Sequence, residues 1–125
     1  MVRVMAALQA ASVGDQAAFE DYVGGGPGDP FLKQPFNVRS ETPQKDALYL
    51  LASSGGFLQD LLYGATGLRL GADGLEAVHA PLLPRSVREL VIRGASVRGR
   101  RIDVQLVRAA DGQVRRTLHT HGGKP

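Results

Sequence analysis

Residues 53–67 read Ser53-Ser-Gly-Gly-Phe57-Leu-Gln-Asp-Leu-Leu-Tyr-Gly64-Ala-Thr-Gly67, and the rest of the chain is organised around them. Between Phe57 and Leu62 the apolar residues recur at i, i+1, i+4 and i+5, which is one face of an α-helix. Gly64 is placed to end that helix, and Ser53 or Ser54 is expected to cap its start.

Two glycines, Gly55 and Gly56, follow the expected cap and allow two interpretations. In the first, the backbone N–H groups of the opening turn are bare and receive an anion or a sugar hydroxyl. In the second, the missing side chains let another backbone pack closely against the helix. The sequence leaves both open.

A second stretch, Pro35-Phe-Asn-Val-Arg-Ser-Glu-Thr-Pro43, precedes residues 53–69, and shorter motifs follow at Gly74-Leu75, Leu82-Leu83-Pro84, Ile92-Arg93-Gly94 and residues 98–103. Together these stretches resemble the C-terminal portion of glycoside hydrolase family 65. The resemblance covers most of this chain but only the tail end of such an enzyme. It implies an α+β fold in which the terminal helices of an α/α toroid precede a small antiparallel β-sandwich, and it implies an ancestor that cleaved an α-linked glucoside by inversion.

The same resemblance implies site residues. Glu41 matches the general base that activates water in the hydrolase branch, and Ser54, Gly55, Gly56 and Arg39 would lie beside the sugar. Arg39 stands where the family usually has an aromatic residue, and residues 48–52 lack the family's polar groups, which favours an altered site. A surface glutamate beside a turn remains the alternative interpretation of Glu41. An inverting reaction needs a second carboxylic acid, which we expect to lie outside this sequence.

Local patterns divide the chain into a helical segment, residues 1–66, and a strand segment, residues 67–119, with a tail at 120–125. Helices are expected over 2–12 and from an Asp15 cap to Val23, followed by a Gly/Pro loop at 24–34. Alternating apolar residues then predict five or six short antiparallel strands. The expected strands include a hairpin at 68–77, a strand ending at Gly94, and strands around 102–106 and 114–118.

Composition favours an ordinary soluble domain, because 43% of the 125 residues are hydrophobic and 22% are charged. The chain has no cysteine, which excludes a disulfide framework and a thiolate metal site. The N-terminus is unconvincing as a signal sequence and no stretch approaches a membrane span, so the cytoplasm is the default location. We predict no cofactor and no metal; His79, His119 and His121 lack a carboxylate cluster, and the last two are expected in a mobile tail.

Charge is uneven along the chain. Residues 84–125 hold nine Arg and one Lys against three acidic residues, a net charge of +7, whereas residues 1–83 carry −4. Such a basic half can bind a polyanion, but no aromatic residue follows Tyr63 to stack on bases. The solvated face of a sheet is therefore favoured over a nucleic-acid site.

We expect the chain to be the C-terminal part of a family 65-like inverting α-glucosidase that is inactive alone. An α-linked glucoside would be its substrate only when a catalytic partner completes the site. The alternative is a non-catalytic assembly module, in which apolar helix faces recruit a companion chain or a second copy. A polyanion-binding domain is the third hypothesis.

Overall fold

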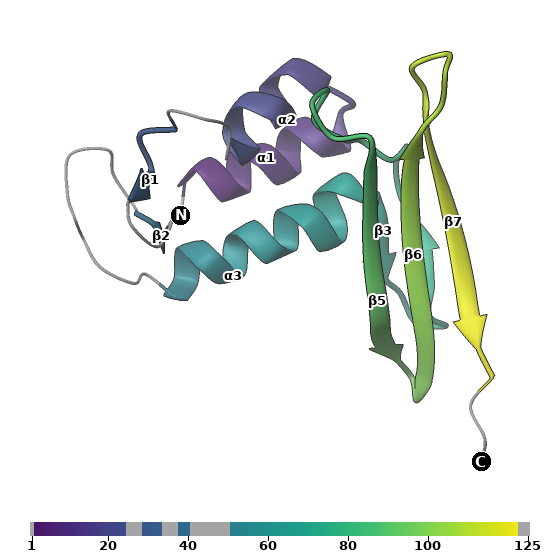
Figure 1. Ribbon diagram of the computed structural model, residues 1–125. Helices are drawn as coiled ribbons and strands as arrows, with labels where there is room; N and C mark the ends of the chain where they lie inside the picture. Colours follow the sequence, from purple (N-terminus) through teal and green to yellow (C-terminus); the bar gives the residue numbers. More distant parts are fainter. Residues whose placement is uncertain (1, 25–28, 34–37, 41–50, 123–125) are drawn as a thin grey trace.

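The computed structural model describes residues 2–24, 29–33, 38–40 and 51–122, and it shows an α+β fold. Three helices lie on one side of an upright three-stranded sheet, and the N-terminus lies away from that sheet (Figure 1). The helical elements are α1 (Val2–Ser12), α2 (Gln16–Val23), α3 (Leu51–Gln59) and the π-helical segment η1 (Asp60–Ala65). The strands are β1 (Leu32–Lys33), β2 (Val38–Arg39), β3 (Leu68–Leu70), β4 (Leu75–Ala77), β5 (Glu89–Val97), β6 (Arg100–Arg108) and β7 (Val114–His121).

Helices α1 and α2 form the expected hairpin. The Asp15 carboxylate caps α2 by accepting a hydrogen bond from the Ala18 backbone N–H at 3.0 Å. Phe19 is fully buried, and Ala7 and Ala11 of α1 are fully buried with it. Small residues on α1 thus let an aromatic ring from α2 fill the space between the helices.

Helix α3 differs from the prediction at both ends. It begins at Leu51, so neither Ser53 nor Ser54 is its cap, and the capping prediction is wrong. It also continues past Gly64 as η1, and the chain leaves the helix at Gly67, whose φ of +66° suits glycine. Packing explains the extension, because Gly64 lies against the Phe19 ring and Ala65 is fully buried.

The strands form three antiparallel groups: β1 with β2, β3 with β4, and the sheet β5-β6-β7. The hairpin at 68–77 is confirmed, with Leu68 opposite Ala77 and Leu70 opposite Leu75. Strand β1 falls inside the stretch expected to be a loop, 24–34, because its residues pair with β2. The hairpin β3-β4 packs on the inner face of the larger sheet, which makes this part of the molecule sandwich-like.

Two expectations about the larger sheet are wrong. Strand β5 does not end at Gly94; it runs to Val97 through a bulge between Ile92 and Ala95. The Asp103 carboxylate accepts a hydrogen bond from the Gly94 N–H at 2.7 Å, which satisfies the amide that the bulge takes out of the ladder. Strand β7 extends to His121, so the tail predicted to begin at 120 is partly a paired strand.

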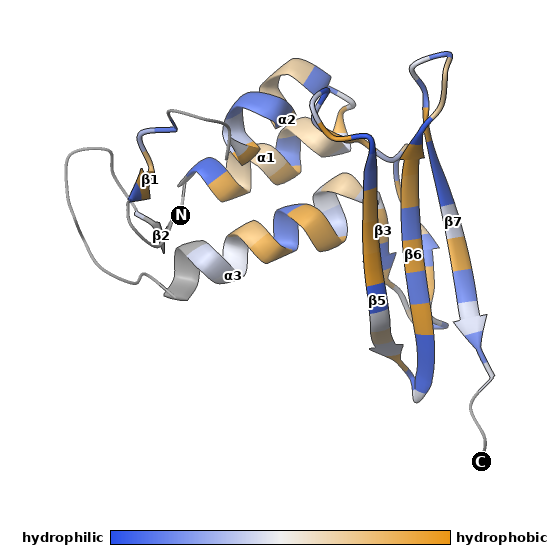
Figure 2. Ribbon diagram, viewed as in Figure 1, coloured by the Kyte–Doolittle hydropathy of each residue, from blue (hydrophilic) through white to orange (hydrophobic). Residues whose placement is uncertain are grey.

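The helices and the sheet share one hydrophobic core. Along β6 hydrophobic and hydrophilic residues alternate (Figure 2), and Val104 and Leu106 are buried on the inner face. They meet Phe19 from α2 and Leu68 from β3, together with Leu83 from the segment after β4. The residues that cover the inner face of the sheet therefore come from both the helical segment and the strand segment of the chain.

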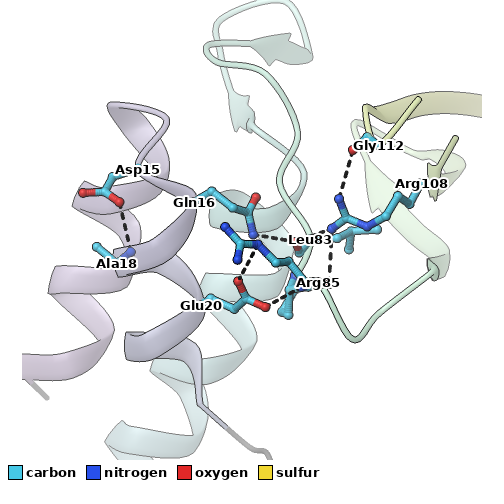
Figure 3. Close-up of polar contacts among 9 residues, drawn as sticks. Asp15, Gln16, Ala18, Glu20, Leu83, Arg85, Arg108 and Gly112 are labelled. Atoms are coloured by element: carbon cyan, nitrogen blue, oxygen red, sulfur yellow. Dashed lines mark hydrogen bonds and ion pairs between the residues drawn. The ribbon is translucent and has the colours of Figure 1, made fainter. Parts of the chain in front are cut away.

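Polar contacts join α2 to the sheet through the segment around Leu83 (Figure 3). The Leu83 carbonyl accepts hydrogen bonds from the Gln16 side-chain amide and from the Arg108 guanidinium, both at 2.7 Å. Arg108 also donates to the Gly112 carbonyl at 3.0 Å, and Glu20 accepts from the Arg85 backbone N–H. The loop between β4 and β5 is thereby held to α2 on one side and to the end of β6 on the other.

Candidate functional site

Glu41, the predicted general base, lies outside the described residues. Of Arg39 only the backbone is described, in β2 opposite Leu32. Ser54, Gly55 and Gly56 are described and lie together in α3. Whether the five predicted site residues meet around a sugar therefore stays a prediction, and the structure bears on Ser54, Gly55 and Gly56.

Gly55 and Gly56 occupy the fifth and sixth positions of α3. Only the first four N–H groups of a helix lack an intrahelical partner, so the amides of both glycines belong to the helix's own ladder. The position of both glycines inside α3 therefore favours the second interpretation over the first. Ser54 is exposed, so its side chain is accessible to a ligand.

The two glycines differ in what surrounds them. A Cβ atom on Gly56 would lie 2.7 and 2.8 Å from the two Cγ methyls of Val4 in α1, whereas a Cβ on Gly55 would meet nothing within 4 Å. Gly56 is buried, and Val4 is only 6% exposed. Close packing of α1 on α3 is therefore the reason for glycine at position 56, as the second interpretation of the glycine pair expected.

Asp60 is a buried carboxylate that the sequence analysis assigned no role. It lies one helical turn beyond Gly56, at the start of η1, and is 1% exposed. Burying a carboxylate costs free energy unless it interacts with other polar groups. The buried side of the helix at Asp60 is therefore expected to include polar as well as apolar contacts. The sequence signal was an acidic residue between Leu58 and Leu61 within an otherwise apolar helix.

The histidines are placed differently from the prediction. His119 and His121 belong to β7, and His121 Nε2 lies 2.8 Å from Asp103 Oδ2. The hydrogen bond from the Gly94 N–H lowers the pKa of Asp103, and His121 adds to that effect. Within the described part of the chain, no group of three or more histidine or acidic side chains gathers in a metal-binding arrangement.

No described helix combines the length and the apolar character needed to cross a membrane. Helices α1, α2 and α3 have 11, 8 and 9 residues.

A 73-residue stretch of this chain is 36% identical to the protein-glucosylgalactosylhydroxylysine glucosidase of Danio rerio. The match covers 58% of this chain but 11% of the glucosidase. No family model matches the chain, and no solved structure matches it. The similarity supports a relationship between this chain and glycoside hydrolases.

Proposed function

We propose that this chain is the C-terminal part of a family 65-like inverting α-glucosidase and is not catalytic alone. The observation that carries the proposal is the 36% identity, over 73 residues, to a protein whose name describes a glucosidase acting on glucosylgalactosyl hydroxylysine. The α+β architecture, with helices packed on a sandwich-like sheet, agrees with it. The helices would be the last ones of an α/α toroid.

In this proposal Glu41 holds the general-base position. An inverting glycosidase uses one carboxylic acid to protonate the leaving oxygen and a second carboxylate, about 6.5–9.5 Å away, to deprotonate the attacking water. Glu41 supplies the second group, and the first comes from another polypeptide segment. Ser54 and Arg39 would donate hydrogen bonds to sugar hydroxyls, while Gly56 sets how closely α1 approaches α3. This chemistry needs no cofactor.

The exposed apolar face of α3 and η1 supports the proposal that another chain binds there. Leu58, Leu62 and Tyr63 are 57%, 39% and 40% exposed, although leucine is among the residues most often buried. Neighbouring apolar side chains on one surface are typical of an interface. A companion catalytic chain would cover this face in the cytoplasm.

The same exposed face also favours a second candidate function, a non-catalytic assembly module. In that case the face would be covered by a second copy of the chain or by a companion without an active site. Light scattering of the purified chain at several concentrations, with identification of co-purifying protein, measures whether the face is covered. A monomer at all concentrations, with no co-purifying protein, would favour an independent module over a part of a larger enzyme.

Activity separates the two candidates. The purified chain, assayed with kojibiose, trehalose and glucosylgalactosyl hydroxylysine, should release no glucose. A shortened Danio rerio glucosidase that lacks the 73-residue match should regain activity when this chain is added, with β-glucose as the first product. Glu41→Gln should abolish the restored activity, and a matched change on the exposed sheet surface, Glu89→Gln, should leave it intact. Turnover by the isolated chain would contradict its proposed inactivity, and restored activity that survives Glu41→Gln would overturn the role of Glu41.

A further inference from the structure

A hollow of about 530 Å³ opens between α1, η1 and the β3-β4 hairpin. It falls within the range of small-molecule sites, about 300–1,000 Å³. Apolar side chains from three elements line it: Leu8 of α1, Leu70 of β3, and Val78 just after β4. Tyr63 of η1, which lines the hollow, follows Gly56 at a distance of about 10 Å along the helix axis by the 1.5 Å rise per residue. The hollow therefore lies about two helical turns from Gly56.

Arg69 of β3 places a positive charge on the lining of this hollow. Glu76 stands directly opposite Arg69 in the hairpin, but its carboxylate folds over Gly71 and occupies the place that a Cβ there would take. Consequently Arg69 forms neither an ion pair nor a side-chain hydrogen bond with any of the residues that the structure describes. A guanidinium can donate two parallel hydrogen bonds to a carboxylate or a phosphate.

Three further polar side chains line the hollow. The Tyr63 phenol has no hydrogen-bond partner among the described residues, and its ring is 40% exposed. Ser12 donates its hydroxyl proton to the Gln9 carbonyl at 2.7 Å, which leaves its oxygen as an acceptor. His79 Nδ1 lies 2.8 Å from the Ala80 carbonyl, which orients the ring and leaves Nε2 for a ligand.

Backbone contacts fix the walls of the hollow before any ligand arrives. The Val78 N–H donates to the Gly67 carbonyl at 2.9 Å, and the His79 carbonyl accepts from the Arg116 guanidinium at 3.4 Å. Arg116 also donates to the Thr66 carbonyl. The segment that carries Val78 and His79 is thereby tied both to the end of η1 and to β7, so the hollow is largely preformed.

We propose that this hollow binds a small organic anion, with a carboxylate or phosphate on Arg69 and an aromatic or aliphatic body against Tyr63, Leu70 and Val78. The charged group of the ligand forms an ion pair with the Arg69 guanidinium, which is not paired with Glu76 across the hairpin. The body covers apolar side chains that water now contacts, since Leu70 is 63% and Val78 49% exposed. A neutral sugar could form hydrogen bonds with the Ser12 and Tyr63 hydroxyls but would leave the Arg69 charge without a counter-ion.

The test is a nitrogen-15 NMR titration of the whole chain with phenyl phosphate, benzoate, inorganic phosphate and benzyl alcohol. Phenyl phosphate or benzoate should shift the amides of Tyr63, Leu70 and Val78, and the one that binds more tightly identifies the anion. Benzyl alcohol lacks the charge and inorganic phosphate lacks the ring, so each should bind about tenfold or more weakly than the better anion.

Two matched charge deletions decide the role of Arg69. Arg69→Gln should weaken the better anion about tenfold or more. Arg98→Gln, at the exposed β5-β6 turn, removes the same charge away from the hollow and should leave the affinity within about twofold. Equal losses in both variants, shifts confined to other residues, or equal binding of inorganic phosphate would overturn the proposal. None of these results depends on Glu41 or on glucosidase activity, so the proposed function stands or falls separately.

Discussion

Replacing each of the two adjacent glycines of α3 by alanine tests the packing explanation directly. Both substitutions remove a glycine from the same helix, and alanine is favoured there by about 1 kcal/mol. Gly55→Ala adds its methyl group where nothing lies within 4 Å. We therefore expect it to raise the free energy of unfolding by about 1 kcal/mol, which corresponds to about 4 °C in melting temperature for a chain of this size.

Gly56→Ala adds the same methyl group against Val4, at 2.7 and 2.8 Å from the two Cγ atoms. A contact this short forces movement, and valine in a helix has one strongly preferred rotamer, so α1 must shift. Overpacking of this kind costs about 1–3 kcal/mol. Since the helix-propensity gain is common to both variants, Gly56→Ala should be less stable than Gly55→Ala by about 1–3 kcal/mol.

Urea unfolding followed by circular dichroism at about 222 nm measures this difference, with equal slopes confirming that the unfolded states are comparable. Val4→Ala removes both methyls and leaves only the Val4 Cβ at 3.1 Å, so in that background most of the difference between Gly56→Ala and Gly55→Ala should disappear. If Gly56→Ala is as stable as Gly55→Ala in the unmodified chain, then α1 does not press on position 56. The glycine would then need another explanation, and contact with a sugar would be the first to test.

Two further predictions concern the sheet. Arg108→Gln should lower the free energy of unfolding by about 2 kcal/mol, because it leaves the Leu83 and Gly112 carbonyls short of a donor; a thermal melt that matches the unmodified chain would contradict this. The pKa of Asp103 is lowered in the folded state by the Gly94 N–H and by His121, so its contribution to stability is present above the unfolded pKa, about 3.9, and is lost as pH falls through the folded value. Asp103→Asn should therefore flatten the fall in melting temperature between about pH 5 and pH 3, and an unchanged slope would refute that assignment.

Elements with strong local signals were predictable from the sequence. Asp15 caps α2 as expected, and the hairpin at 68–77 has the expected strands. The alternation through Ile102, Val104 and Leu106 placed one face of β6 in the core. In each case neighbouring residues alone determine the structure, through a side-chain cap, a turn or a period of two.

Two of the errors share a different cause, because in each of them a distant residue stabilises a position where the local sequence predicts the end of an element. Gly94 has the φ of +68° expected where a strand stops, but Asp103 binds its amide and the strand continues. Gly64 was expected to end the helix, but the Phe19 ring packs on it and the helical segment extends to Ala65. A glycine in the sequence indicates a position where the backbone conformation or the close packing requires the absence of a side chain. Whether a helix or strand ends at that position depends on contacts from elsewhere in the chain.

The proposed sites were predictable to unequal degrees for the same reason. Glu41 and the glycine pair came from two short stretches, 35–43 and 53–69, that resemble family 65. The hollow was not predicted from the sequence because the residues that line it lie between positions 8 and 79 of the chain. Its Arg69 is available to a ligand because Arg69 and Glu76, although opposite each other, do not form an ion pair. Opposite charges facing each other in a hairpin ordinarily indicate a cross-strand pair. Only the position of the Glu76 carboxylate over Gly71 shows that the guanidinium is left for another group.

Both proposals use residues of the continuous helical stretch formed by α3 and η1: Ser54 in α3 for the sugar, and Tyr63 in η1 for the anion. Gly56 fixes α3 against α1 at one end, and Tyr63 lines the hollow seven residues later. Arg69→Gln and Glu41→Gln each remove one charge, so a comparison of the two single variants separates the proposals. Loss of anion binding with retained complementation in Arg69→Gln, and the reverse in Glu41→Gln, would show that the two functions use different residues. Joint loss in both single variants would instead mean that the two functions are coupled.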